Sequence, residues 1–302
     1  MSLLRQPAMH YLYFAIVSLV WGSGFFLMKK AGFAFGPLTI AAGSTFGGAV
    51  VLWLFWVVTR GEWHIRRRHL LPLAFVSFFG YILPYSAQPF LVNHIGHGFI
   101  GVMVSLVPVL TIVVSIPILG VFPSRTQLAG VLVGMGCIVL MVIDGMNRNA
   151  GLLYLVLAVS VPLCYAVSNT LVQRSFQEIP SIMLAAIFMT AATVCLTPLS
   201  LGLEEIRVDS NLTHAVAAMV FLAVFARGIG MLLFYKLIKE RGPLFASMVT
   251  YVIPLEVLIW SWVDNERITV VQVSAIMIVL LMVGVVQRDI IRRGKKGPEP
   301  GS

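Results

Sequence analysis

One arginine and one glutamate lie inside long apolar runs of this chain. Arg227 is near the middle of the run 215–237, and Glu256 is inside the run 243–263. A charge within an apolar span is energetically expensive, so it usually faces the protein interior or a water-filled cavity. Arg227 is therefore a candidate anchor for the carboxylate of a small molecule.

Arg227 and Glu256 have a structural alternative, which is to pair with each other. They lie on consecutive spans, and counted back from the link between these spans their depths differ by roughly 6 Å at about 1.5 Å per residue. An arginine side chain is long enough to bridge that difference. Without a cationic partner, Glu256 is instead a candidate proton-coupling acid, because burial disfavours the charged form of a carboxylate. Both interpretations stay open at the level of sequence.

Aromatic residues in span interiors form a second candidate group. Tyr81 and Tyr85 are one helical turn apart and share a face. Rings with polar groups can bind an apolar or cationic ligand and still keep a hydrogen bond. The alternatives are plain packing, a belt at the membrane interface and hydrogen bonds between helices. The candidates for lining a cavity are Trp21, Phe25, Tyr81, Tyr85, Tyr165 and Tyr251, with Ser105, Asn169 and Thr250 as polar residues on the same spans.

Two segments of the chain repeat one pattern. Gly96 to Pro108 reads GHGFIGVMVSLVP, and Gly242 to Pro254 reads GPLFASMVTYVIP, so glycine, phenylalanine and proline recur at fixed offsets. Proline removes a backbone donor from a helix. Pro108 and Pro254 are therefore candidate paired hinges, with static kinks as the alternative.

The elements that carry these residues are long and apolar. Of the 302 residues, 59% are hydrophobic and 11% are charged, whereas soluble domains have about 25% charged residues. Runs of roughly 18 to 25 apolar residues are long enough to cross a bilayer as helices. The sequence predicts an all-α polytopic membrane protein with ten transmembrane helices, at residues 10–28, 37–58, 70–91, 98–119, 127–143, 152–173, 181–201, 215–237, 243–263 and 269–287.

The ten spans divide into two five-helix repeats, residues 1–145 and 146–288, followed by a flexible cytoplasmic tail at 289–302. Because five is odd, the second repeat crosses the membrane in the opposite direction to the first. Inverted repeats are typical of secondary transporters, whose binding site lies near the midplane between the repeats. The weakly similar segments Trp21–Lys30 and Tyr165–Arg174 fall at matching positions of the two halves.

Charge indicates the orientation and argues against nucleic acid as a partner. The net charge is +9, but the basic residues lie in short links and in the tail. Fifteen of the 21 lysines and arginines are on the side of the amino terminus and five are on the other. By the positive-inside rule both termini are cytoplasmic, and a multi-pass protein of the inner (cytoplasmic) membrane is expected.

Motifs for other chemistry are missing from the sequence. His94 and His97 have no third ligand for zinc. A nucleotide-hydrolysing motif and a convergent acid, base or metal cluster are likewise not found. We therefore expect no metal, no cofactor and no enzymatic activity.

Three motifs carry a family resemblance over about residues 10–288. They are Trp21-Gly22-Ser23-Gly24-Phe25, the glycine-rich run 128–136 and the segment from Pro254 to Glu266. In these the chain resembles the drug/metabolite transporter superfamily, specifically its EamA-type ten-helix exporters, and most of all the aromatic amino-acid exporter branch. The resemblance implies export of small metabolites through a central cavity lined by helices one, three, four, six, eight and nine. Gly120 stands where a symmetric counterpart of Glu266 would lie, so the halves are not interchangeable.

The sequence thus predicts an exporter of amino acids, aromatic and other neutral ones, and of related small metabolites, working by alternating access. Drugs, nucleotide sugars and phosphorylated metabolites are alternative substrates, and a membrane enzyme or a channel are alternative classes. The expected partners are the small-molecule substrate (amino acids and possible cationic drugs) and the lipid bilayer. The chain is expected to be a monomer or a weak dimer.

Overall fold

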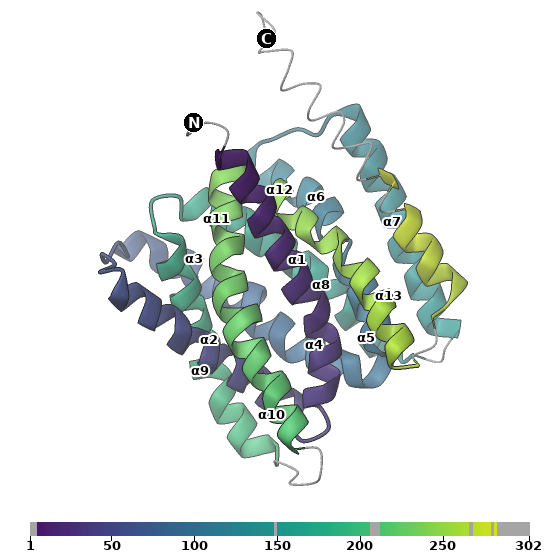
Figure 1. The fold of residues 1–302 in the computed structure, drawn as a ribbon. Helices are drawn as coiled ribbons and strands as arrows, with labels where there is room; N and C mark the ends of the chain where they lie inside the picture. Colours follow the sequence, from purple (N-terminus) through teal and green to yellow (C-terminus); the bar gives the residue numbers. More distant parts are fainter. Residues whose placement is uncertain (1–4, 148–149, 206–211, 266–267, 279–280, 283–302) are drawn as a thin grey trace, which may run out of the picture.

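The computed structural model describes residues 5–147, 150–205, 212–265, 268–278 and 281–282. All regular structure in these ranges is helical, and the helices form one bundle (Figure 1). In chain order the elements are α1 (Arg5–Ala31), α2 (Pro37–Val58), η1 (Arg67–His69), α3 (Leu70–Ser77), η2 (Phe78–Ile82), α4 (Leu83–Ile95), α5 (His97–Val104), α6 (Val107–Leu119), α7 (Arg125–Asn147), α8 (Leu152–Ser175), α9 (Ser181–Leu203), α10 (Leu212–Phe221), η3 (Leu222–Gly230), α11 (Met231–Arg241), α12 (Pro243–Ser247), η4 (Met248–Tyr251) and α13 (Ile253–Val263).

Nine helices within the described ranges are long and apolar enough to cross a membrane, and they confirm the first nine predicted spans. They are Met9–Ala31, Pro37–Val58, Arg67–Ile95, His97–Leu119, Leu128–Asn147, Leu152–Ser175, Ser181–Leu203, Leu212–Arg241 and Pro243–Val263. The tenth predicted span, 269–287, falls partly on residues outside the described ranges, but residues 270–278 are helical. Figure 1 places this last helix beside α7 at the edge of the bundle.

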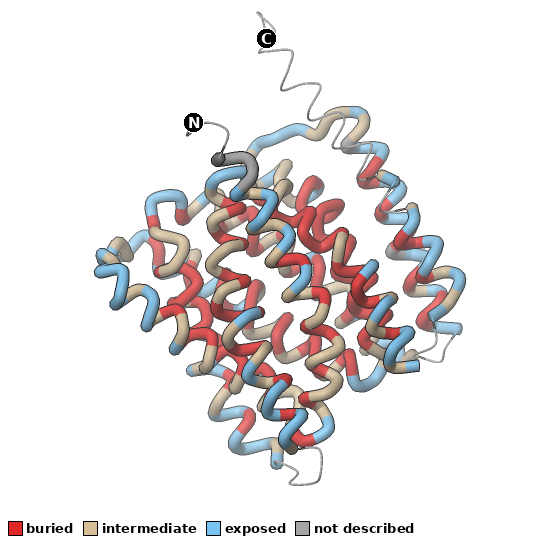
Figure 2. The backbone as a smooth tube through the Cα atoms, viewed as in Figure 1, coloured by how far each residue is buried: buried red, intermediate tan, exposed pale blue. Residues whose placement is uncertain are grey.

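Burial is highest at the centre of the bundle and lowest on its outer helices (Figure 2). Large apolar side chains stand exposed on the outside, including Leu54, Leu132 and Leu201. In water such a surface would be unfavourable, but lipid solvates it well. The exposed apolar surface therefore suits a protein that sits in a bilayer.

The third span of each half contains a wider, π-helical segment. In the first half η2 separates α3 from α4, and in the second half η3 separates α10 from α11. Segments of this kind change the direction of side chains within a helix and are frequent at functional sites. Tyr81 lies in η2 and Arg227 lies in η3.

The fourth span of each half is broken just before its proline. Helix α5 ends at Val104 and α6 begins at Val107, while η4 ends at Tyr251 and α13 begins at Ile253. Both spans start after a glycine with a positive φ of 87°, Gly96 and Gly242, a conformation that side chains rarely tolerate. The repeated sequence pattern thus corresponds to a repeated backbone break.

Helix α1 runs through the middle of the second half. It contacts α10, η3 and α11 on one side and α13 on another. The Trp21 Nε1–H donates to the carbonyl oxygen of Ala226 at 3.2 Å, whereas Gly22 lies against the carboxylate of Glu256. Spans eight and nine were expected to be direct neighbours at these depths. That expectation is wrong, because α1 separates Arg227 from Glu256.

Candidate functional site

A central cavity opens between the two halves, and its empty space of about 670 Å³ includes open solvent at its mouth. Its wall comes from spans one, three, four, six, eight and nine, the set that the family resemblance implies. It is lined by Trp21, Gly24, Phe25, Met28, Gly80, Tyr81, Tyr85, Gln88, Val104, Val107, Tyr165, Ser168, Asn169, Leu222, Ala226, Arg227, Met231, Phe234, Thr250 and Ile253.

Arg227 is the one charged residue in this lining. It is buried, and the carbon atom of its guanidinium lies 3.4 Å from the centre of the Tyr85 ring. Its Nε has no hydrogen-bond partner among the described residues. A cation stacked on a ring is held in place without losing all its donors. The guanidinium forms no ion pair with a described residue, so its charge is left for an anionic group in the cavity.

Two close-packed glycines explain how this charge reaches the cavity. A Cβ on Gly47 would lie 2.6 Å from the Ala223 side chain, and one on Gly48 would lie 2.6 Å from the Arg227 Cβ. Only glycine lets α2 approach η3 so closely. Together with the π-helical turn, this contact fixes the direction from which Arg227 enters the site.

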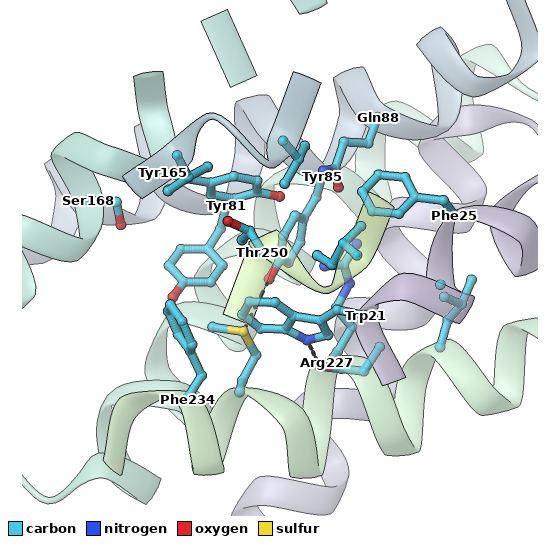
Figure 3. Close-up of a pocket in the computed structure, with 18 of the residues that line it drawn as sticks. Trp21, Phe25, Tyr81, Tyr85, Gln88, Tyr165, Ser168, Arg227, Phe234 and Thr250 are labelled. Atoms are coloured by element: carbon cyan, nitrogen blue, oxygen red, sulfur yellow. Dashed lines mark hydrogen bonds between the residues drawn. The ribbon is translucent and has the colours of Figure 1, made fainter. Parts of the chain in front are cut away.

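Aromatic rings make up much of the remaining wall. Tyr81 packs edge-on against Tyr85 at 5.3 Å and stacks on Phe188 at 5.1 Å. On the other side Trp21 contacts Phe234 at 4.7 Å. Figure 3 shows Trp21, Tyr81, Tyr85 and Phe234 converging on one space from different helices. The cavity offers an apolar, π-rich surface around a single guanidinium.

Three polar side chains of the wall are available to a ligand. Gln88, Ser168 and Asn169 line the cavity, and none of them hydrogen-bonds another described residue. Thr250 also lines it, but its hydroxyl donates to the carbonyl oxygen of Ser247 at 2.7 Å. Polar groups inside a protein are normally paired. Unpaired groups on a cavity wall are therefore natural contacts for the polar atoms of a substrate.

The structure brings eight of the ten residues proposed for the cavity to its wall: Trp21, Phe25, Tyr81, Tyr85, Tyr165, Asn169, Arg227 and Thr250. Ser105 and Tyr251 are buried but do not line it. The Ser105 hydroxyl donates instead to the carbonyl oxygen of Val102 at 2.6 Å. Both residues lie on the broken fourth spans, where the turn directs their side chains away from the cavity.

Sequence reasoning missed Gln88, Ser168, Met231 and Phe234 in this wall. Helical spacing could have found them. Gln88 is three residues after Tyr85, and Ser168 is three residues after Tyr165, so each shares a face with a residue already proposed. Met231 and Phe234 follow Arg227 by four and seven residues and share its face in the same way.

Glu256 lies outside this lining and forms no ion pair with Arg227, although both residues are described. Of the two alternatives that the sequence left open, the ion pair is therefore not the one that the structure shows. Pro108 and Pro254 also stand outside the lining, as the second residues of α6 and α13 directly after the backbone breaks. A hinge role for either proline stays a prediction. Glu266, at the end of the proline-to-glutamate motif, lies outside the described residues.

A solved structure with a similar fold supports the architecture. It carries only the description "Crystal structure of protein" and aligns with a TM-score of 0.69 at 18% sequence identity. The alignment covers 92% of this chain and 97% of that chain. At this identity the likeness shows the fold alone. No curated protein matches the chain.

The model of the EamA-like transporter family matches the chain twice, over residues 8–143 and over residues 152–287. The two matches account for most of the 302 residues and confirm that the chain contains two repeats of one unit. With the membrane-spanning bundle and the cavity between the halves, they assign a function class. The chain belongs to the EamA-like transporter family and is a membrane transporter of small molecules.

Proposed function

We propose that this transporter exports amino acids, with aromatic and other neutral ones as its main substrates, as members of the aromatic amino-acid branch of the family would. The observation that carries the proposal is the position of Arg227. Its guanidinium is buried on the face of Tyr85 at the wall of the central cavity. There it can bind a carboxylate while the rings around it bind an apolar side chain.

The remaining polar groups fit the other end of an amino acid. An ammonium group needs acceptors, and the amide oxygens of Gln88 and Asn169 and the hydroxyl oxygen of Ser168 supply them. Cation–π contact with the rings adds to this. A neutral amino acid thus has a partner in the wall for its carboxylate, its ammonium and its side chain.

Phosphorylated metabolites and nucleotide sugars fit this cavity less well. A phosphate carries about −2 charge and usually binds to more than one cation. The lining contains Arg227 and no other basic residue among those described. Apolar drugs fit the rings but leave the guanidinium without a partner, which is unfavourable in a buried site.

The two broken spans support the proposal of alternating access. The breaks before Pro108 and Pro254 occupy matching places in the two halves, beside the cavity. In the proposed orientation both termini are cytoplasmic and the protein lies in the inner membrane. Bending at one break and then at the other would open the cavity to each side in turn.

The test is transport of labelled amino acids into proteoliposomes that contain the purified protein. Saturable flux that unlabelled aromatic and neutral amino acids compete away is the expected result. Tyr251→Phe, outside the cavity wall, serves as the matched control for substitutions of the lining tyrosines. Flux that rises linearly with concentration would indicate a channel, and flux of drugs or sugar nucleotides without amino-acid flux would overturn the proposed substrate.

A further inference from the structure

The carboxylate of Glu256, on α13, lies against α1 and has no role in the proposed binding mode. Glu256 is 9% exposed and lies roughly in the middle of its span. A Cβ on Gly22 would collide with the Glu256 carboxylate, so only glycine leaves room for it there. Gly22 directly follows Trp21, which lines the cavity. Adjacent residues of one helix thus contact the substrate cavity and this acid.

Within the part of the chain that the structure describes, Glu256 has no cation to balance its charge. Its Oε1 is buried and has no hydrogen-bond partner among the described residues. Glu256 lies in the first turn of α13, and its carboxylate points to α1, where it lies against Gly22 beside the backbone N–H of Ser23.

The elements packed against α13 supply no counter-charge either. These described elements are α1, α5 and η4. None of their titratable groups forms an ion pair or a hydrogen bond with Glu256. Asp264, on the carboxyl side of α13, binds Lys29 and Lys30 at 2.5 and 2.8 Å. Apart from Arg5, whose side chain lies outside the described part, the titratable groups in question are His10, Tyr11, Tyr13, Lys29 and Lys30 on α1, His97 on α5 and Tyr251 on η4.

An unbalanced carboxylate in the middle of a membrane span is expensive as an anion and much less so as a neutral acid. The closed contact between α1 and α13 excludes water from it. If the two helices part, water reaches the group and the anion becomes solvated. Protonation of Glu256 and closure of this contact therefore favour each other.

We propose that Glu256 is a proton-binding site that couples proton movement to transport through α1. The proton comes from water on one side of the membrane, forms an O–H bond with the carboxylate, and leaves to water on the other side. The coupling to substrate passes along α1, from Gly22 at the acid to Trp21 at the cavity. This part rests on the proposed transport function, whereas the proton site itself does not.

The proton site can be tested without any substrate, by infrared difference spectra of the purified protein at low and high pH. The wild type is expected to show a carboxylic-acid C=O band that disappears as the pH rises, and Glu256→Gln should lack this band. Asp144→Asn is the matched control, since Asp144 is also a buried acid in a span but accepts a hydrogen bond from the Thr269 hydroxyl at 3.1 Å. An unchanged spectrum of Glu256→Gln would overturn the proposal. If that variant does not fold, Glu256→Asp must shift the band, and a band that stays in place overturns the proposal equally.

The coupling is tested in proteoliposomes by comparing two kinds of flux. Exchange of labelled for unlabelled amino acid needs no net proton movement, so Glu256→Gln should retain it. Net flux should respond to an imposed pH gradient in the wild type and lose that response in Glu256→Gln. A variant that keeps the wild-type response disproves the coupling. Lack of any amino-acid flux in the wild type would reject the substrate proposal, and the infrared band would still decide the proton site.

Discussion

The third spans of the two repeats share a backbone and differ in chemistry. Each contains a π-helical segment in its middle, η2 in the first repeat and η3 in the second. Gly242 follows Gly96 by 146 residues, and the same offset relates Tyr81 to Arg227 and Tyr85 to Met231. The first repeat thus presents two tyrosines to the cavity where the second presents an arginine and a methionine.

These counterparts meet across the cavity. The Tyr85 hydroxyl donates to the Met231 sulfur at 3.5 Å, and the Tyr85 ring carries the Arg227 guanidinium. At the same offset Glu256 corresponds to Leu110. Both buried charges discussed above therefore belong to the second repeat. The duplicated backbone builds a symmetric cavity, and side-chain differences between the repeats make its chemistry one-sided.

The largest effect is expected from Arg227→Gln. Loss of a charged hydrogen-bond donor of about 1.5–3 kcal/mol should weaken a carboxylate substrate by roughly 10- to 150-fold. Apparent affinities for an aromatic amino acid and for its uncharged amide, measured by competition in proteoliposomes, check this, and the amide should be affected far less. Tyr81→Phe at the counterpart position should change either affinity little. Equal losses for both variants would contradict the one-sided chemistry.

Gly48→Ala should come next, through the position of η3. The added methyl group would lie 3.1 Å from the carbonyl carbon of Arg227, which is backbone and cannot move alone. Overpacking of this kind costs about 1–3 kcal/mol, so the thermal unfolding temperature in detergent should fall. Gly24→Ala is the matched control, because its methyl group would meet Leu222 at an ordinary 3.7 Å. If both variants have the same unfolding temperature, the close contact between η3 and α2 does not contribute to stability.

Tyr85 separates the contribution of its ring from that of its hydroxyl. Tyr85→Leu removes the face on which Arg227 stacks and should weaken carboxylate binding by about 0.5–2 kcal/mol. Tyr85→Phe keeps the ring and loses only the contact with Met231, so its affinity should stay close to that of the wild type. Competition assays on the two variants give the answer. A similar loss in both would assign the effect to the hydroxyl instead.

Substitution of Asp264, at the end of the fourth span of the second repeat, should give the smallest effect. In the second repeat Asp264 binds Lys29 and Lys30 of α1, while at the matching place of the first repeat Arg174 of α8 donates to the carbonyl oxygen of Ile118 at 3.0 Å. Partial burial alone would raise the pKa of Asp264, but hydrogen bonds from the two lysines and their charge outweigh it and lower that pKa. An acid with a lowered folded pKa stabilises the fold above its unfolded pKa and loses this contribution as the pH falls through the folded value.

Thermal unfolding below about pH 4, the range in which free aspartate titrates, checks that pH dependence. The wild type should lose stability on acidification, and Asp264→Asn should be less stable at neutral pH and lose less. The difference at neutral pH should be at most about 1 kcal/mol, since ion pairs near a surface contribute little. Identical pH profiles of the two proteins would show that the ion pairs of Asp264 do not stabilise the fold.

Much of the site was predictable because helical spacing and apolar runs are local properties. The nine spans follow from composition and length, and the paired glycines follow from the repeated pattern. Eight cavity residues follow from their place inside the spans together with the set of helices that the family resemblance implies. The prediction that Ser105 and Tyr251 line the cavity was wrong because the backbone leaves regular helical geometry at the breaks. A rule based on helical spacing assumes regular geometry. The Arg227–Glu256 ion pair, one of the two alternatives, is not formed, because spans that are adjacent in sequence need not be in contact at every depth.

The sequence by itself determined the class of fold, since long apolar runs must cross a bilayer as helices. A repeat with an odd number of spans must also be followed by a copy of opposite orientation in the membrane. It also placed the rare charges inside the spans. Only the tertiary structure decided their partners: α1 passes between η3 and α13, so Arg227 stacks on Tyr85 from the other repeat and Glu256 is left against Gly22. Packing of helices distant in sequence depends on side-chain shape along whole faces, which a residue pattern within one span does not encode.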